Sequence, residues 1–551
     1  MSVFIGYPSF MAYQMMKGKK DNNDGFPSIP GTIARYSALG LTNEEMSKNP
    51  VWVDKTGNGH DLQMKNFSWK GMSGIGGYVA DIDEWGTNST AAYFERNSIK
   101  ITATFKENAS LGLLYHNIKL RQSCVLKVTG IPEGCDAFLD DRLGNRFYMS
   151  EDGVYEIIPS NFLAEALYLS IEKYPERWYG SKLTIEQLPL YPGALVFDGV
   201  DDYGTCDNFP ILTKEKGYTV VALRQWITRG EIAQGLVSNV KNWLKDGAFL
   251  LEYRNIQAEH LNKPISFGAI GSENDLPHIL TYQTSKSYNG VSITTGNFEG
   301  TDVLHVGKLA PTKVGTCINA AIWELVFLDH DATEEELTKI KDYFVKTYPW
   351  LFPDQAWTVT GKTNEDEDRA TIANITGNGN DLVLSNFGFA EGSGYNEEGE
   401  YAGYLVTDGV DDKIISSVFK MGKDFTVVGE WVLLQNINVS SLRMDGSFVI
   451  RNNETGLSLL LDRVGSYTRV SDKSLKAFCS NGTIYKSDWA EQIETVTKDG
   501  TGGNRQLMIA GRSNGLEYDK MAFKNLAIYP RILSKEDCIK AYNYLQTLKA
   551  K

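Results

Sequence analysis

Six aspartates stand in two short clusters of the same spacing. Asp198, Asp201 and Asp202 form the first cluster, and Asp408, Asp411 and Asp412 form the second. Carboxylates this close together offer the several oxygen ligands that a hard cation such as Ca2+ requires. In the other interpretation, the glycine after the first aspartate makes a tight turn, and the carboxylates accept hydrogen bonds from local backbone amides. The clusters lack the fixed ligand order of an EF-hand, which favours the turn.

Three aromatic residues lie in hydrophilic surroundings that predict exposed side chains. Trp178 and Tyr179 occur in the sequence Glu-Arg-Trp-Tyr-Gly, and Trp85 occurs in Asp-Glu-Trp-Gly. An exposed aromatic ring offers an apolar face on which a sugar ring can stack. These residues are therefore candidate glycan-binding residues, with plain packing as the alternative. Trp226 and Trp431 lie in apolar strands instead and are predicted to be buried.

Patterns that would support catalysis are missing from the sequence. A retaining glycosidase needs two carboxylates about 5 Å apart, and no strand with suitably alternating carboxylates occurs. No Gly-x-Ser-x-Gly seats a nucleophile, and the histidines lack the spacing of a metal site. The six cysteines include no Cys-x-x-Cys pair and are predicted to be buried thiols. We therefore expect a chain that is not an enzyme and that uses no cofactor, unless the acidic clusters bind Ca2+.

Charge and hydropathy exclude two classes of partner. The chain has 551 residues, with 55 Lys and Arg against 69 Asp and Glu, and a net charge of −14. A surface this acidic repels phosphate, so we expect no nucleic-acid partner. No stretch approaches the roughly 18 apolar residues of a membrane helix, so we expect no membrane partner. The order of charge and apolar residues at the N-terminus is also not that of a secretion signal.

The chain contains two copies of one ordered set of motifs. Residues 56–74 and 376–394 align without a gap and are identical at ten of nineteen positions. Residues 195–202 then match 405–412, and residues 304–307 match 508–511. Each copy ends in a predicted helix that opens with a capping signature, Thr333-x-x-Glu336 or Ser534-x-x-Asp537. Three blocks in the same order indicate two copies of one domain.

The spacing of the blocks predicts an insertion in the first copy. Gly57 and Gly199 are 142 positions apart, whereas Gly377 and Gly409 are 32 apart, a difference of 110. The extra residues alternate between apolar and polar, as at Ile101, Ala103 and Phe105, which predicts antiparallel strands. We therefore divide the chain into an arm (1–31), a first sandwich (32–78 and 192–352), an inserted β domain (79–191) and a second sandwich (353–551). Residues 349–353, with a proline at each end, are predicted to be a stiff linker.

The repeated motifs resemble a known family of folds. The order Thr-Gly-Asn-Gly, Asp-Gly-Val-Asp-Asp and Thr-Val-Val followed by tryptophan is similar to that of laminin-G-like, concanavalin A-like jelly rolls. The resemblance implies an all-β protein of two such sandwiches, the first interrupted by an inserted antiparallel β domain. It also implies binding of glycans or proteins and, as in some members, a calcium at the sandwich rim. The sequences of residues 54–74 and 183–203 further resemble those of virion proteins of Bacteroides phages, including the crAss-like group.

This second resemblance implies a fibre or decoration protein on the surface of a phage particle, on head or tail. Such a protein would bind bacterial surface polysaccharide and form a homo-oligomer, as a trimer or in many copies. The apolar arm would anchor it to other virion proteins, unless it covers the first sandwich. Its candidate anchor residues are Phe4, Ile5, Tyr7, Phe10, Met11 and Tyr13. The alternatives are a soluble or secreted bacterial lectin, an accessory protein of glycan degradation, and a spacer that binds nothing.

Overall fold

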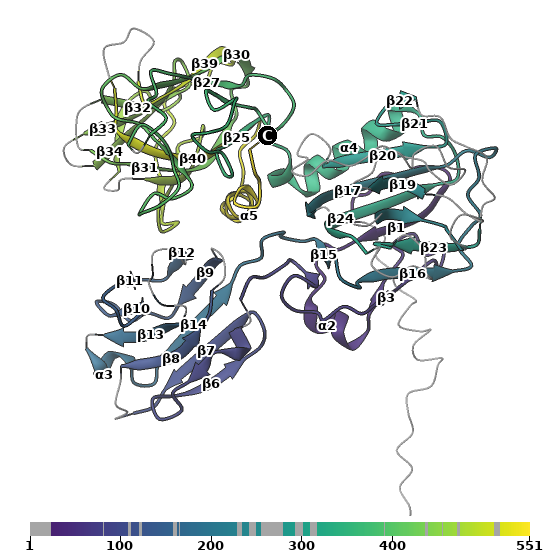
Figure 1. Ribbon diagram of the computed structural model, residues 1–551, viewed down its shortest axis with the longest axis horizontal. Helices are drawn as coiled ribbons and strands as arrows, with labels where there is room; N and C mark the ends of the chain where they lie inside the picture. The colour runs from purple at the N-terminus through teal and green to yellow at the C-terminus, as the bar shows by residue number, and fades with distance from the viewer. Residues whose placement is uncertain are drawn as a thin grey trace, which may run out of the picture.

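The computed structural model describes residues 24–551 except 81, 108–111, 121–123, 158–161, 163, 165, 173, 229–233, 242–248, 255–278, 293–300, 309–316, 391, 436–438, 454–455, 471–473, 512–517 and 551. The protein is all-β, with two sandwiches and an inserted antiparallel β domain, which confirms the predicted fold class (Figure 1). The predicted anchor residues lie outside the described residues. Among the helices described, none is both long and apolar enough to cross a bilayer.

The first sandwich packs two sheets around an apolar core that includes Trp52, Phe197 and Trp226. One sheet runs in the order β22 (Val291–Ser292), β21 (Ser287–Tyr288), β20 (Leu280–Thr284), β17 (Thr219–Thr228), β24 (Asn319–Leu328), β15 (Leu195–Asp198) and β4 (Gly74–Ile75), with β1 (Thr32–Ser37) also paired to β24. The other runs in the order β19 (Phe249–Arg254), β18 (Gln234–Ser238), β23 (Val303–Val306), β16 (Tyr203–Asp207), β3 (Leu62–Lys65) and β2 (Val51–Trp52). The short helix α2 (Asn43–Lys48) lies between β1 and β2 in the chain.

The inserted residues form two five-stranded sheets with a core of their own. One sheet runs β11 (Arg146–Met149), β10 (Asp136–Asp140), β13 (Leu167–Glu172), β8 (Leu113–Ile118) and β5 (Gly86–Thr87). The other runs β12 (Gly153–Ile157), β9 (Cys124–Thr129), β14 (Lys182–Gln187), β7 (Lys100–Phe105) and β6 (Ala92–Arg96). Along β7, Ile101, Ala103 and Phe105 point into the core, as their period of two predicted. Two short helical turns, η1 (Ile82–Glu84) and α3 (Pro175–Trp178), complete this domain.

The second sandwich has two eight-stranded sheets. One runs β28 (Gly394–Asn396), β29 (Tyr404–Val406), β40 (Met521–Tyr529), β31 (Thr426–Leu433), β36 (Leu475–Cys479), β37 (Thr483–Lys486) and β38 (Glu491–Ile493), with β25 (Gln355–Thr358) paired to β40. The other runs β26 (Thr371–Ile372), β27 (Leu382–Ser385), β30 (Lys413–Met421), β39 (Gly503–Ile509), β32 (Val439–Met444), β33 (Phe448–Asn453), β34 (Gly456–Leu461) and β35 (Tyr467–Val470). Trp431 is buried in this core, as predicted.

Each sandwich carries one long helix, attached in the same way. Helix α4 (Glu334–Thr347) begins after Thr333, and α5 (Lys535–Leu545) begins after Ser534; both residues cap their helices, as the sequence predicted. The hydroxyl of Thr219 accepts a hydrogen bond from the backbone of the turn before α4 and donates one back to it. Thr426 makes the same two bonds to the turn before α5. The repeat therefore includes the attachment of the helix.

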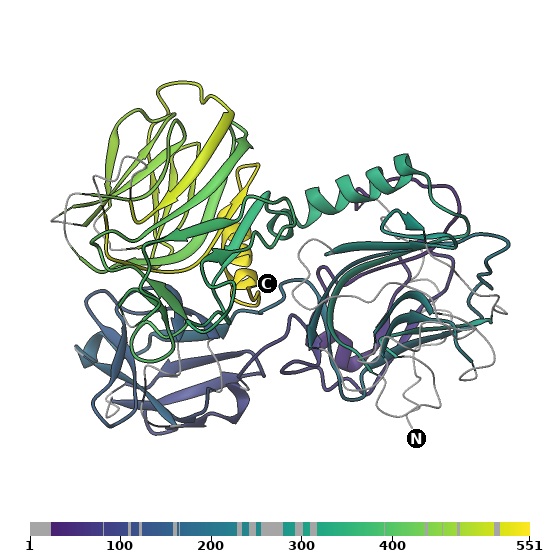
Figure 2. The ribbon, with the colours of Figure 1, turned by 45° about the horizontal axis from the view of Figure 1, so that its top comes forward.

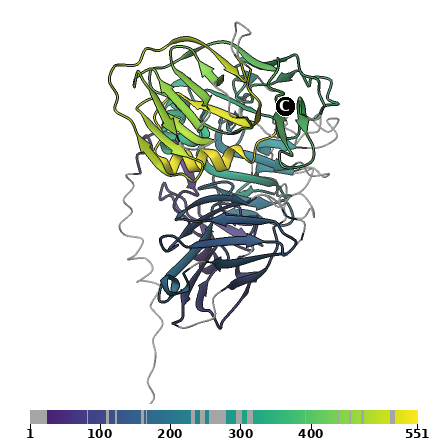
Figure 3. The ribbon, with the colours of Figure 1, turned by 90° about the vertical axis from the view of Figure 1, so that its left-hand side faces the viewer.

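Helices α4 and α5 and the turn η5 (Pro349–Leu351) lie where the three domains meet. One apolar cluster joins Val154 of the insert, Trp323 of the first sandwich and Tyr529 of the second. Helix α4 follows the outer face of the first sandwich toward the second (Figure 2), and α5 lies on the side of the second sandwich that faces the insert (Figure 3). The predicted linker 349–353 is part of this cluster, because Trp350 and Leu351 are buried. Pro349 opens its helical turn, where the missing N–H costs nothing.

Candidate functional site

The two acidic clusters form equivalent turns. In each cluster, one ligand atom from each of the three aspartates lies within 4.8 Å of the others. Val200 N donates a 2.8 Å hydrogen bond to Asp198, and Val410 N does the same to Asp408. Such a trio of carboxylates has the donor chemistry for Ca2+, but these oxygens already serve the turn.

The last aspartate of each cluster is buried and ties the turn to the first repeated block. Asp202 accepts hydrogen bonds from Ser73 Oγ at 3.0 Å and from Asp198 N at 3.1 Å. Asp412 accepts the matching bonds from Ser393 at 3.1 Å and Asp408 at 2.8 Å. Burial raises the pKa of Asp202 to about 7 and that of Asp412 to about 6. These contacts give the repeated aspartates and serines a structural role in the turns. Calcium binding at the turns stays a prediction.

The predicted glycan-binding tryptophans are not exposed. Trp178 is 1% exposed and packs on Phe105, with ring centroids 5.0 Å apart, and Trp85 is 2% exposed beside Tyr115. The expectation of exposure was wrong because their polar neighbours lie at surface turns while the indole rings complete a small core. Tyr179 is half-buried. The described geometry brings none of the three into a binding surface.

A cleft of about 670 Å³ lies between the insert, helix α5 and the segment that leads from the insert to the first sandwich. Ligand sites in proteins commonly have volumes of about 300–1,000 Å³. The apolar part of its wall comprises Val128, Val154, Leu188, Pro189, Pro192, Trp489 and Ile539. The charged part comprises Lys127, Lys535 and Lys540 with Asp152, Asp488 and Glu536. Because cations and anions balance, the cleft is suited to a ligand without strong net charge.

One polar side chain in the cleft wall, that of Asn543, has an oxygen without a hydrogen-bond donor. Asn543 of α5 lines the cleft and is 3% exposed, and its Oδ1 accepts no hydrogen bond from any described residue. A buried carbonyl without a donor costs about 1–3 kcal/mol. A ligand hydroxyl or amide would recover this cost where a shift of the Asn543 side chain exposes this oxygen to the cleft. Asn543 therefore marks the cleft as the best candidate binding site of the described chain.

Sequence reasoning did not find this cleft. Its walls come from residues 127–192 and 488–543, which the chain separates by about 300 positions. Docking of the insert on the second sandwich creates the cleft, and no local pattern encodes that contact. Asn543 lies in an ordinary amphipathic helix, which gives no signal of its own.

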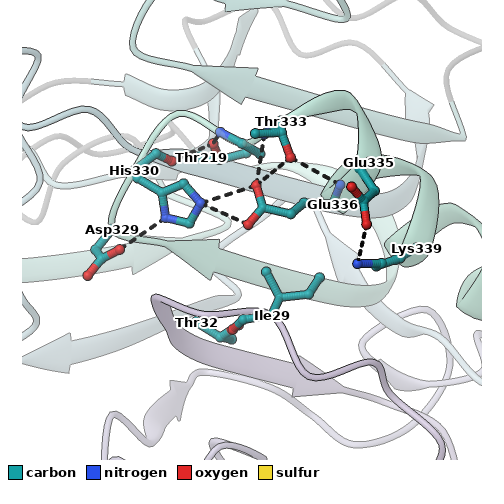
Figure 4. Close-up of polar contacts among 10 residues, drawn as sticks. Ile29, Thr32, Thr219, Asp329, His330, Thr333, Glu335, Glu336 and Lys339 are labelled. Carbon is teal, nitrogen blue, oxygen red and sulfur yellow. Dashed lines mark hydrogen bonds and ion pairs between the residues drawn. The ribbon is translucent and has the colours of Figure 1, made fainter.

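A second polar cluster surrounds His330 at the start of α4 (Figure 4). Its Nδ1 lies 3.1 Å from Asp329 Oδ1, and its Nε2 lies 3.3 Å from Glu336 Oε1. Glu336 also accepts a hydrogen bond from the backbone of Thr333, which completes the capping box. Partial burial acts to lower the pKa of His330, but the two carboxylates outweigh it and raise that pKa. The cluster is fully used in closing the helix end.

Comparison with known proteins gives no family for this chain. No family model matches it, and no curated protein matches it. Among solved structures, Trypanosoma rangeli sialidase in complex with sialic acid matches at 10% identity over 83% of each chain, with a TM-score of 0.25. The receptor-binding domain of botulinum neurotoxin mosaic serotype C/D matches at 11% identity and a TM-score of 0.25, over 34% of this chain and 50% of that one. The chain thus spans about half of this last structure.

These matches correct one prediction from sequence. The expectation that the chain is not an enzyme is contradicted by the sialidase structures that match over 83% of this chain, at about 10% identity. That expectation was wrong as a conclusion from missing motifs, since catalytic groups need not stand in a short recognisable pattern. TM-scores of 0.20–0.26 assign no catalytic residue to this chain.

Proposed function

We propose that this chain binds glycans of the bacterial cell surface in the cleft between the insert and α5. The supporting observation is the buried, unpaired Oδ1 of Asn543 in a cleft with an apolar wall and a balanced charged rim. Sugars combine apolar CH faces with hydroxyl donors, so a sugar ring matches both features. A neutral or weakly charged polysaccharide is the ligand class that this chemistry favours.

We further propose that the chain works in many copies on the surface of a phage particle, as a fibre or decoration protein. The support is the resemblance of the repeated motifs to phage virion proteins, together with the apolar arm in residues 1–16. A single shallow sugar site binds weakly, and repeated sites raise avidity by about 10²–10⁴ without new contacts. A trimer or a multicopy shell would supply those sites, and the arm would join them to other virion proteins.

The decisive experiment substitutes Asn543 and measures binding to purified bacterial surface polysaccharide. Asn543→Leu removes the unpaired carbonyl, so we expect binding to weaken about five- to tenfold, the value of one hydrogen bond. The melting temperature should stay the same or rise, because the carbonyl is unpaired in the free protein. Asn504→Leu, at an exposed position on β39, is the matched control. Equal binding by Asn543→Leu and the control would refute the cleft as the glycan site.

A further inference from the structure

We infer that Glu156 is a positioning residue that clamps the insert to the second sandwich and so holds the two walls of the cleft together. Glu156 lies on β12, and its side chain is 8% exposed. Tyr542 of α5 donates a 2.5 Å hydrogen bond to its Oε2. The Nζ atoms of Lys476 and Lys524 each lie 3.7 Å from its carboxylate oxygens. The inference rests on the proposed function only in taking the cleft as the place where the ligand binds.

The cluster around Glu156 is electrically balanced only when the insert is docked. Lys524 also pairs with Glu430 at 3.2 Å, and Tyr404 donates a hydrogen bond to Glu430. Burial acts to raise the pKa of Glu430, but the ammonium groups of Lys524 and Lys476 lower it to about 2. Within the second sandwich alone, two ammonium groups therefore face one carboxylate. Glu156 of the insert supplies the missing negative charge, and an unbalanced buried charge is strongly unfavourable.

Glu430 and Lys524 are specific to the sandwich that contacts the insert and are not part of the repeated fold. The register of the strands makes Leu223 the counterpart of Glu430 and Trp323 the counterpart of Lys524 in the first sandwich. Those counterparts are apolar and buried. At these two positions the sheet of the first sandwich is apolar, whereas the sheet of the second sandwich, which meets the insert, is charged.

The clamp and the cleft share the same two elements. On β12, Gly153 and Val154 line the cleft, and Glu156 follows two residues later. On α5, Lys540 and Asn543 line the cleft, and Tyr542 lies between them in sequence. Movement of β12 away from α5 would therefore open the cleft and separate its walls.

The test compares single and charge-balanced variants of the full chain. We expect Glu156→Gln to raise the rate of proteolysis at the contact between the insert and the second sandwich about tenfold or more. We also expect it to increase the radius of gyration in X-ray scattering. The double variant Glu156→Gln with Lys524→Met restores charge balance, so we expect its proteolysis to return to within about threefold of the wild type. Glu95→Gln, at an exposed position on β6, controls for loss of charge on the insert.

Two outcomes overturn the inference. One is an unchanged proteolysis rate and radius of gyration in Glu156→Gln. The other is a double variant as loose as the single one, which would show that packing and not charge balance was lost. Circular dichroism of each variant distinguishes undocking from unfolding of the insert. If Glu156→Gln loosens the insert but the wild type binds no polysaccharide, the clamp stands and the proposed function fails.

Discussion

Tyr542 donates a hydrogen bond of 2.5 Å to Glu156, a residue that lies 386 positions earlier in the chain. This contact joins the last helix to the inserted domain, although the first sandwich separates them in sequence. The apolar cluster of α4, α5 and η5 connects all three domains around the same place. The insert is therefore a wall of the cleft as well as a domain in its own right, and substitutions at this junction should affect both stability and binding.

The repeated serine is expected to stabilise the acidic turn. Ser393 Oγ donates to Asp412 and accepts from Gly388 N at 2.8 Å. Ser393→Ala leaves both partners without this hydroxyl, so we expect the free energy of unfolding to fall by about 1–3 kcal/mol. Urea unfolding measures the change. Thr495→Ala, at an exposed position of the same sandwich, should change stability by less than about 0.5 kcal/mol.

The raised pKa of Asp412 predicts how the effect of its replacement varies with pH. Between about pH 4 and pH 6 the folded protein keeps a proton on Asp412 that the unfolded chain has released. The folded state then binds more protons, so this contribution to stability falls as the pH rises through that range. We expect Asp412→Asn to be more destabilising near pH 4.5 than near pH 8. Urea unfolding at both pH values measures this difference.

The control for this prediction is Asp411→Asn, because Asp411 is exposed in the same turn. Its effect on stability should vary much less between the two pH values. A destabilisation by Asp412→Asn that grows with pH would contradict the burial argument. Added Ca2+ offers a separate measurement, since a cation held by the turn would lower the pKa of Asp412 and remove the pH dependence.

Protonation of His330 should stabilise the start of α4. Its contacts with Asp329 and Glu336 raise its pKa. The stabilisation is therefore complete below the unfolded pKa of about 6.5 and is lost as the pH rises through the higher folded value. We expect His330→Gln to lower the melting temperature more at about pH 5.5 than at about pH 9. His116→Gln, at an exposed position on β8, should show no such trend.

The sequence predicted what depends on local chemistry. Alternation along 101–105, the caps at Thr333 and Ser534, and the burial of Trp226 are all present, because each follows from strand period, capping or hydrophobicity within one segment. All six cysteines are buried, as expected. The exposure of Trp178 was predicted wrongly, because a residue's neighbours in sequence do not fix the direction of its side chain. The cleft was missed because it depends on docking between distant segments.

Burial of Trp178 makes a last prediction about the insert. Its indole ring packs on Phe105 in a core formed by the insert alone, so Trp178→Ala should lower the stability of the insert by about 3–5 kcal/mol. Hydrogen exchange should then become faster in β7 and β14, while β31 and β40 of the second sandwich keep their protection. Tyr93→Ala removes an aromatic side chain that is 68% exposed in the same domain and should leave exchange unchanged. If Trp178→Ala weakened polysaccharide binding without any faster exchange, Trp178 would be a contact for sugar and its assignment to the core would fail.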